Sequence, residues 1–306
     1  MQHLLTLLDM TTAEIERVLT LARDLKNRYE AGVREPLFPG RVLGLLFEKP
    51  SLRTRISFEA GIAHLGGNSI YLTSDVGWGQ RETPTDFIRV LSQYLDVLVC
   101  RGHDQQLLEL LARESACPII NGLTNTYHPC QALADLFTMR ELRGNLEGAT
   151  LAFIGDGNNV ARSLAVACGH LGVRMIVASP AGYELDPPFL QALKQAVPKV
   201  QLEQTQDPVE AIRDATVVYT DVWASMGQEK EAAQRRRDFS RFQVNGQLMT
   251  HAPRDAYFFH CLPAHRGEEV TDEVLDGPQS AVIRQAANRL HAQKGVLAWL
   301  LSSRVQ

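Results

Sequence analysis

Apolar residues in the first half of the chain follow two alternating patterns. Short apolar runs typical of buried strands occupy residues 42–47, 69–72, 97–100 and 118–121. Apolar residues at helical spacing predict helices over residues 12–26, 51–65, 85–94, 104–115 and 129–143. Because strands and helices alternate, we expect this half to form a parallel sheet covered by helices.

The second half repeats the same alternation. Strands are predicted at residues 150–154, 174–178, 200–203, 216–220 and 256–259. Helices are predicted at residues 159–172, 187–196, from 208 onward, and over a long final stretch from 280 to about 301. This pattern also indicates a parallel α/β sheet.

A short stretch without a helical or strand pattern separates the two halves. Residues 145–148 interrupt the helical pattern, and 306 residues suffice for two domains. We therefore expect two parallel-sheet α/β domains, residues 1–145 and 146–279, with a cleft between them. The final helix, residues 280–306, is long enough to cross back and pack on the first domain.

Polar groups of both halves share one position relative to the strands. Each falls just after a predicted strand: residues 51–55, Arg101, Asn159, residues 221–227 and residues 261–266. In open α/β sheets ligands bind outside the carboxyl ends of the strands. These groups are therefore the candidate site, brought together at the cleft.

The group at residues 51–55 has the composition of an anion site. Ser51, Arg53, Thr54 and Arg55 occupy the first turn of a predicted helix. A helix start offers unpaired backbone N–H groups, and Arg binds phosphate oxygens in bidentate fashion. The pattern favours phosphate binding; the alternative is a capped helix with solvated arginines.

Composition restricts the class of protein. The chain is 45% apolar and 22% charged with a net charge of −4, which is typical of a soluble globular protein and disfavours nucleic acid or an anionic membrane as partner. No signal peptide or membrane-spanning run is expected. Five scattered cysteines without metal spacing favour a reducing cytoplasm. Arg235, Arg236 and Arg237 suggest a solvated helix face.

Other motifs leave alternatives open. A dinucleotide site after the strand at 150–154 is not expected, since Val160 stands where the third glycine of the motif would be. His128 could be a buried histidine, a metal ligand or a general acid. No second ligand stands at metal spacing, so no metal is predicted, and a donor role is favoured. Cys261 alone is more often a buried inert thiol, and Asp221 alone a turn residue.

Four motifs, in this order, resemble those of the aspartate/ornithine transcarbamoylase family over essentially the whole chain. The two phosphate-side motifs are Phe47-Glu48-Lys49-Pro50-Ser51-Leu52-Arg53-Thr54-Arg55 and His128-Pro129-Cys130-Gln131. The two that resemble the ornithine branch are Asp221-x-x-x-Ser225-Met226-Gly227 and His260-Cys261-Leu262-Pro263.

The resemblance implies transfer of the carbamoyl group of carbamoyl phosphate to the δ-amino group of L-ornithine, in arginine biosynthesis, by a cytoplasmic homotrimer without cofactor. It implies a carbamoyl-phosphate domain at residues 1–145 and an ornithine domain at residues 146–279.

The resemblance also implies roles for particular residues. For carbamoyl phosphate these are Ser51, Leu52 (through its backbone), Arg53, Thr54, Arg101, His128, Gln131, Cys261, Leu262 and Arg289. For the α-amino and α-carboxylate groups of ornithine they are Asn159, Asp221, Ser225 and Met226. The catalytic residues implied are Arg53, Arg101, His128 and Cys261, with Cys261 and the Leu262 carbonyl facing the δ-amino group.

The chain departs from the family pattern at two places. The first, Leu52, is expected to be tolerated because the contact there is through the backbone, and the second bears on the substrate. Leu52 replaces a usual Thr, and Gly77 stands where a Gln usually reaches a neighbouring subunit, with Trp78 and Gln80 beside it. The alternatives are therefore an enzyme acting on an N-acylated ornithine or another amine, or a non-catalytic homologue. Asp221 with Ser225 and Met226 argues against putrescine, which has no α-amino or α-carboxylate group.

Overall fold

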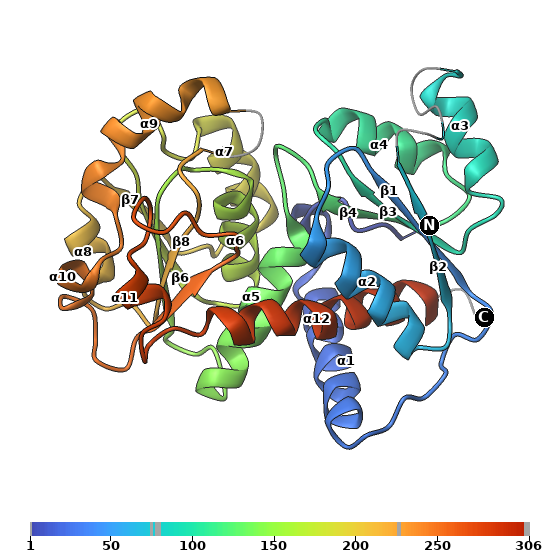
Figure 1. The fold of residues 1–306 in the computed structure, drawn as a ribbon, viewed down its shortest axis with the longest axis horizontal. Coiled ribbons are helices and arrows are strands. Elements are labelled where there is room, and N and C mark those ends of the chain that lie inside the picture. The colour runs from blue at the N-terminus through green and yellow to red at the C-terminus, as the bar shows by residue number, and fades with distance from the viewer. Residues whose placement is uncertain (1, 74–75, 77–80, 225–227, 303–306) are drawn as a thin grey trace. The chain divides into compact units, whose positions relative to one another are not determined.

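The computed structural model describes residues 2–73, 76, 81–224 and 228–302. These residues form two compact units, one of residues 1–137 with 287–306 and the other of residues 138–286. Each unit contains one parallel sheet (Figure 1). The prediction of two parallel-sheet α/β domains is confirmed.

The first unit holds a four-stranded sheet in the order β2-β1-β3-β4. Its strands are β1 (Val42–Phe47), β2 (Asn68–Leu72), β3 (Val97–Arg101) and β4 (Ile119–Leu123). Its helices are α1 (Thr12–Glu30), α2 (Leu52–His64), α3 (Pro84–Leu91), α4 (Gln105–Glu114), the start of α5 (Pro129–Arg143) and most of α12 (Val282–Ser302), with a 3₁₀ turn η1 (Leu7–Asp9). Because the strands are parallel, the ends of β1 and β3 lie side by side, with Phe47 opposite Arg101.

The C-terminal helix α12 completes the first unit. A Cβ at Gly295 of α12 would lie 2.6 Å from the Val18 carbonyl oxygen of α1, so the two backbones are in close contact. On another side, a Cβ at Gly61 of α2 would lie 3.5 Å from Lys294 Cγ. The prediction that the final helix packs on the first domain is confirmed.

The second unit holds a five-stranded sheet in the order β7-β6-β5-β8-β9. Its strands are β5 (Thr150–Ile154), β6 (Arg174–Ala178), β7 (Leu202–Thr205), β8 (Val217–Thr220) and β9 (Tyr257–His260). Its helices include α6 (Asn159–His170), α7 (Pro187–Ala196), α8 (Pro208–Ile212), α9 (Ala232–Asp238), α10 (Gly246–Met249) and α11 (Asp272–Leu275), with 3₁₀ turns η3 (Glu229–Glu231) and η4 (Ser240–Phe242).

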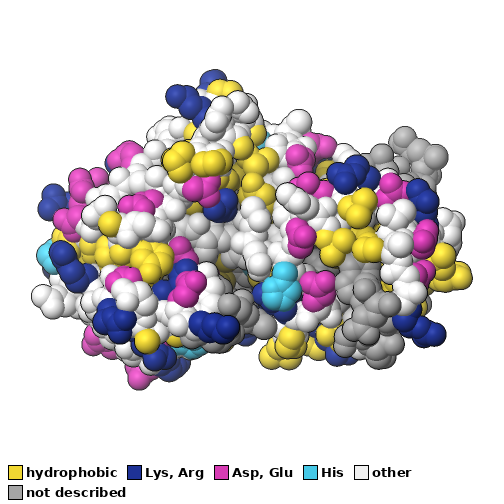
Figure 2. Space-filling view, turned by 90° about the horizontal axis from the view of Figure 1, so that it is seen from above, with side chains coloured by type: hydrophobic (Ala, Val, Ile, Leu, Met, Phe, Trp, Pro, Cys, Tyr) yellow, Lys and Arg dark blue, Asp and Glu magenta, His cyan; other side chains and the backbone are white. Residues whose placement is uncertain are grey.

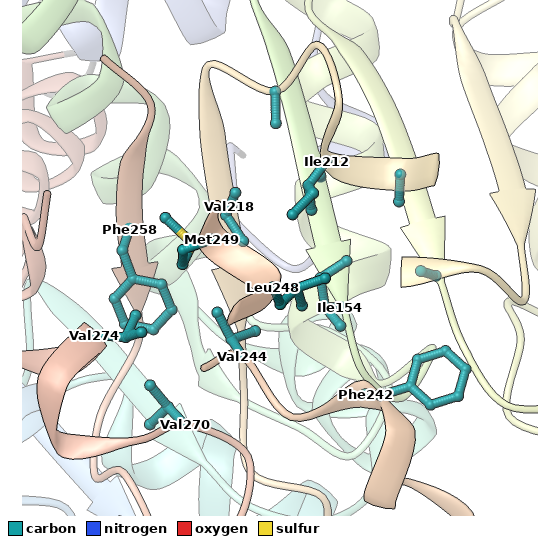
Figure 3. Packing of buried hydrophobic residues seen from close by; sticks show 14 of the residues in the cluster. Ile154, Ile212, Val218, Phe242, Val244, Leu248, Met249, Phe258, Val270 and Val274 are labelled. Carbon is teal, nitrogen blue, oxygen red and sulfur yellow. The ribbon is translucent and has the colours of Figure 1, made fainter. Parts of the chain in front are cut away.

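A buried apolar cluster fixes the short helices of the second unit. Ile154 and Phe258 from the sheet pack with Phe242, Leu248 and Val274 from η4, α10 and α11 (Figure 3). Burial of such side chains contributes about 1.5–3 kcal/mol each, and their van der Waals contacts hold the connecting loops in place. The sheet therefore carries its polar carboxyl-end loops on a rigid base.

The glycines at the end of β5 have a structural reason. Gly155 has a φ of +152°, and a Cβ at Gly157 would lie 2.7 Å from the Glu184 carbonyl carbon. Only glycine allows this turn. The Gly155-Asp156-Gly157 motif is thus explained without a dinucleotide.

The distribution of surface charge and the state of the cysteines agree with what the composition predicts. Acidic and basic side chains are interspersed over the face shown in Figure 2. All five cysteines are free thiols, four of them buried. Among the described residues no helix is both long and apolar enough to cross a membrane.

Candidate active site

The N-terminus of α2 presents the predicted anion site. Ser51 is the N-cap, and its hydroxyl accepts a hydrogen bond from the Thr54 N–H at 3.3 Å. Leu52 begins the helix with its side chain 74% exposed, so this residue offers its backbone rather than its side chain to a ligand. Arg53 follows, partly buried. An anion at this end of the helix would be stabilised by the backbone N–H groups and the helix dipole.

Two guanidinium groups converge on the hydroxyl of Thr54. Arg101 Nη1, from the end of β3, donates to Thr54 Oγ1 at 3.3 Å. Arg289 Nη2, from α12, donates to the same oxygen at 3.1 Å. Arg289 Nη1 also donates to Gln131 Oε1 at 2.5 Å, and Gln131 Nε2 donates to Asp135 Oδ1 at 2.8 Å. We call Thr54, Arg101, Gln131 and Arg289 the Thr54 cluster.

The Thr54 cluster is a buried, positively charged site. Thr54 and Gln131 are at most 2% exposed, as is Arg289, and Arg101 is 9% exposed. The carboxylate of Asp135 accepts from Gln131, and both guanidinium groups donate to Thr54. Because burial strengthens charge interactions, two such cations favour a dianion such as phosphate.

His128 lies in the same charged environment. Its backbone oxygen accepts from the Gln131 N–H at 3.1 Å, which places it at the first turn of α5. Burial lowers the pKa of His128 well below its ordinary value, and the positive charges of Arg289 and Arg101 lower it further. The neutral imidazole therefore predominates near pH 7, and it can donate one hydrogen bond to a ligand oxygen.

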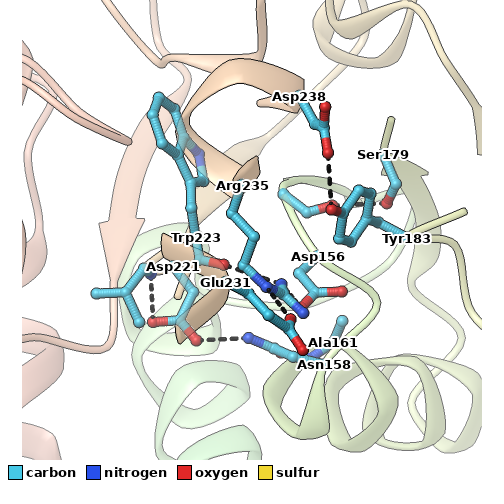
Figure 4. A network of polar contacts seen from close by, with 12 residues as sticks. Asp156, Asn158, Ala161, Ser179, Tyr183, Asp221, Trp223, Glu231, Arg235 and Asp238 are labelled. Atoms are coloured by element: carbon cyan, nitrogen blue, oxygen red, sulfur yellow. Dashed lines mark hydrogen bonds and ion pairs between the residues drawn. The ribbon is translucent and has the colours of Figure 1, made fainter. Parts of the chain in front are cut away.

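In the second unit, Asp221 is the centre of a separate polar cluster. Its Oδ1 accepts from the Val222 N–H at 2.8 Å and from Cys261 Sγ at 2.9 Å. Its Oδ2 accepts from Asn158 Nδ2 at 2.8 Å (Figure 4). These residues follow β5, β8 and β9, which are neighbours in the sheet. We call Asn158, Asp221 and Cys261 the Asp221 cluster.

Cys261 and Leu262 follow β9 in a fixed backbone conformation. The Leu262 N–H donates to His260 Nδ1 at 2.8 Å, and His260 Nε2 lies 3.1 Å from Glu269 Oε1. Potential metal-ligand atoms of Asp221, His260 and Cys261 lie within 4.8 Å of one another. Both ring nitrogens of His260 are already engaged, however, so the histidine has no lone pair available for a metal.

Other predicted residues are placed as follows. Asn159 is the first residue of α6, next to Asn158. Five of the predicted or discussed residues lie outside the described part of the chain: Ser225 and Met226, and Gly77, Trp78 and Gln80 of the loop that departs from the family pattern. Their predicted roles remain predictions.

Sequence reasoning missed two residues in or beside these clusters, Asp135 and Asn158, and misinterpreted a third, Arg235. Asp135 stands four residues after Gln131 on one helical face, a spacing that would have indicated the pair. Asn158 caps α6, where an Asn is expected, but its second bond to Asp221 has no sequence signal. The interpretation of Arg235 as part of a solvated face is wrong: Arg235 is 6% exposed, because it forms an ion pair with Asp156 at 2.6 Å.

Known proteins resemble this chain along nearly its whole length. Residues 2–141 match the family model described as "Aspartate/ornithine carbamoyltransferase, carbamoyl-P binding domain", and residues 147–300 match "Aspartate/ornithine carbamoyltransferase, Asp/Orn binding domain". An ornithine carbamoyltransferase from Anoxybacillus flavithermus is 50% identical over 97% of this chain and 96% of its own length. One from Pyrococcus abyssi is 49% identical over 98% of this chain and 96% of its own.

Solved structures agree with these matches. The ornithine carbamoyltransferase from Pyrococcus furiosus is 48% identical and superposes with a TM-score of 0.95, covering 98% of this chain and 97% of the other. The enzyme from Campylobacter jejuni, titled anabolic, is 35% identical with a TM-score of 0.93 over 99% of this chain and 100% of the other. The chain therefore belongs to the aspartate/ornithine carbamoyltransferase family.

Proposed function

We propose that this chain is an ornithine carbamoyltransferase. It transfers the carbamoyl group of carbamoyl phosphate to the δ-amino group of L-ornithine, giving L-citrulline and phosphate. The observation that carries this proposal is the Thr54 cluster, in which two buried guanidinium groups converge beneath a helix N-terminus. Two relatives that are 50% and 49% identical to this chain are named ornithine carbamoyltransferase, which favours ornithine over other amines.

The start of α2 and the Thr54 cluster would bind carbamoyl phosphate. Ser51, the Leu52 backbone, Arg53 and Thr54 would hold the phosphate, and the exposed Leu52 side chain makes its replacement of Thr tolerable. Arg101 and His128 would donate to the carbamoyl oxygen. Gln131 would face the carbamoyl amide, and Arg289 would lie against the same substrate.

The Asp221 cluster would bind ornithine. Asp221 and Asn159, with Ser225 and Met226, would hold the α-amino and α-carboxylate groups. Cys261 and the Leu262 carbonyl would face the reacting δ-amino group. Because this group attacks the carbamoyl carbon, both residues would also lie near carbamoyl phosphate. Asp221 supplies the negative charge that an α-ammonium group requires.

The mechanism follows from where charge develops. The neutral δ-amine attacks the carbamoyl carbon, the bond from carbon to the bridging oxygen breaks, and phosphate leaves with the electron pair and takes up the proton that the attacking nitrogen loses. Negative charge grows on the carbamoyl oxygen and on the departing phosphate. Arg53, Arg101 and His128 are donors that need little reorganisation to meet this charge, which is usually the largest catalytic term. Holding the two substrates in line adds an entropic contribution.

Further features of the proposal rest on the family. Carbamoyl phosphate is assigned to residues 1–145 with 280–306, and ornithine to residues 146–279, as the names of the two matching family models suggest. We propose a cytoplasmic homotrimer without cofactor or metal. The direction is biosynthetic, toward citrulline and arginine, in keeping with the relative from Pyrococcus furiosus that is named anabolic.

The test is citrulline formation from carbamoyl phosphate and L-ornithine, beside N-acetyl-L-ornithine, N-succinyl-L-ornithine and putrescine. We expect turnover with L-ornithine and little with the other three amines. Turnover only with an acylated ornithine would overturn the substrate and the assignment of the α-amino contacts. No turnover with any amine, in protein that still binds carbamoyl phosphate by calorimetry, would indicate a non-catalytic homologue.

A further inference from the structure

Arg235 of α9 is a buried cation that joins three separate segments. Its Nη1 donates to Asp156 Oδ2 at 2.6 Å and to the Trp223 carbonyl oxygen at 3.0 Å. Its Nε donates to Glu231 Oε2 at 3.0 Å (Figure 4). An arginine is rarely buried to this degree without a specific partner, because its charge must be compensated.

Two of the segments that Arg235 joins, the loops after β5 and β8, carry Asn158 and Asp221 of the Asp221 cluster. Asp156 lies two residues before Asn158 in the turn after β5, and Trp223 lies two residues after Asp221 in the loop after β8. β5 and β8 are paired strands, so the two loops emerge side by side. The bond from Asn158 to Asp221 and the fork of Arg235 are therefore two cross-links between the same two loops.

The cross-link made by Arg235 also compensates negative charge. Burial raises the pKa of Asp156, the negative charge of Asp221 raises it further, and the Arg235 guanidinium opposes both effects. Asp156 and Asp221 thus repel each other across the two loops. Arg235, and to a smaller extent Arg162, offset this repulsion between the two loops.

Helix α9 is also anchored independently of Arg235. The Tyr183 hydroxyl donates to Asp238 Oδ2 at 2.8 Å, and the rings of Trp223 and Phe239 stack with centroids 6.0 Å apart. Apolar packing of Phe239, which is fully buried, fixes the end of the helix. The guanidinium is therefore carried on a rigid element, and its replacement should leave the helix in place.

We propose that Arg235 is a positioning residue for the amino-acid half of the reaction. It holds the loops after β5 and β8 together so that Asp221 and Asn159 meet the α-amino end of the substrate. This inference rests on the proposed function, because it takes the amino acid to bind at the Asp221 cluster.

The test compares Arg235→Gln and Arg235→Lys with a matched control, Arg236→Gln. Arg236 is the next residue of α9, but it is exposed and pairs with Glu268 on the surface. We expect both Arg235 variants to raise the KM for ornithine by about tenfold or more, comparable to losing one hydrogen bond between charged groups. The KM for carbamoyl phosphate should stay within about twofold, and Arg236→Gln should resemble the wild type.

A second measurement separates positioning from a general loss of structure. The inhibition constant of L-norvaline, which has the α-amino and α-carboxylate groups of ornithine but no δ-amino group, should rise in parallel with the ornithine KM. Adding Asp156→Asn to Arg235→Gln should recover part of the loss, because the uncompensated charge beside Asp221 is removed. A merely structural defect would be worsened by the second substitution.

The outcomes distinguish this inference from the proposed function. A wild type that makes no citrulline from ornithine overturns the proposed function and, with it, this inference. An active wild type whose Arg235 variants melt at the wild-type temperature and keep the wild-type ornithine KM overturns the inference alone. Equal increases in both KM values would also overturn it. If Arg235→Gln does not fold, Arg235→Lys and Asp156→Asn provide the same comparison.

Discussion

The environment of His128 decides which protonation state it can use. The ring is 5% exposed, and its pKa is held well below the ordinary value by burial and by the nearby Arg289 and Arg101. A protonated imidazole would be a third cation in a site that already holds two. The neutral ring can donate one hydrogen bond without titrating in the physiological range.

Replacing His128 should therefore lower kcat without changing the shape of the pH–rate profile. We expect His128→Ala to reduce kcat by about 10²–10³, the usual effect of removing one donor to a developing oxyanion. His128→Gln, which keeps an N–H donor, should lose less. Steady-state kinetics from pH 6 to 9 would check both statements. A wild-type inflection near pH 6.5 that disappears in the variants would instead mean that His128 titrates.

At the residue scale, site residues at the ends of strands and helices could be predicted from the sequence, whereas the burial of a single charged side chain could not. Ser51, Arg101 and His128 could be predicted, because they lie at strand or helix ends where ligands bind, and the resemblance named their roles. The burial of Arg235 could not, because its partner Asp156 is distant in the sequence and the two neighbouring arginines are exposed. The bond from Asn158 to Asp221 likewise depends on which strands are neighbours.

At the element scale, the contact between α1 and α12 depends on one glycine. A Cβ at Gly295 would lie 2.6 Å from the Val18 carbonyl oxygen and 3.0 Å from Ala22 Cβ. Both neighbours belong to α1, and the carbonyl oxygen is backbone that cannot rotate away. The helices would have to separate to admit a methyl group.

Gly295→Ala should therefore destabilise the protein, although Gly→Ala in a helix ordinarily stabilises by about 0.5–1 kcal/mol. We expect a net loss of about 1–3 kcal/mol from overpacking, measured as a lower urea midpoint. The matched control is Gly61→Ala in α2, where the nearest atom to the new Cβ is Lys294 Cγ at 3.5 Å, an ordinary contact. This variant should be neutral or slightly more stable. Equal effects of the two substitutions would contradict the packing argument.

The same scale shows why strands were easier to predict than short helices. Each predicted strand has a counterpart, and β5 (Thr150–Ile154) and β6 (Arg174–Ala178) have the predicted bounds, because buried parallel strands are continuous apolar runs. The four-residue helices α10 and α11 were not predicted, since one turn is too short to show a helical period. The strand order β2-β1-β3-β4 depends on tertiary packing, which a linear pattern does not encode.

At the scale of the whole molecule, buried histidines connect stability to pH. His291 of α12 is 6% exposed, and its pKa is lowered to about 3. Burial is the main cause, and the positive charges of Lys294 and Lys26, then of His64 and Arg34, add to it. His128 is shifted in the same direction. Below its ordinary pKa of about 6.5, such a histidine binds a proton when the chain is unfolded but not when it is folded.

Stability should consequently fall as the pH is lowered through this range. With more protons bound in the unfolded state, the free energy of unfolding rises with pH between the lowered pKa and about 6.5. For His291 alone the loss from pH 6.5 to pH 5 is about 1.6 kcal/mol, because the unfolded histidine is half protonated at pH 6.5 and the slope approaches about 1.4 kcal/mol per pH unit only below it. His291→Gln should lose correspondingly less stability than the wild type on acidification, measured by urea unfolding at each pH. Replacing the exposed His251 by Gln is the control for the loss of a histidine side chain from the surface. An unchanged pH dependence in His291→Gln would mean that this ring is protonated in the folded protein as readily as in the unfolded chain.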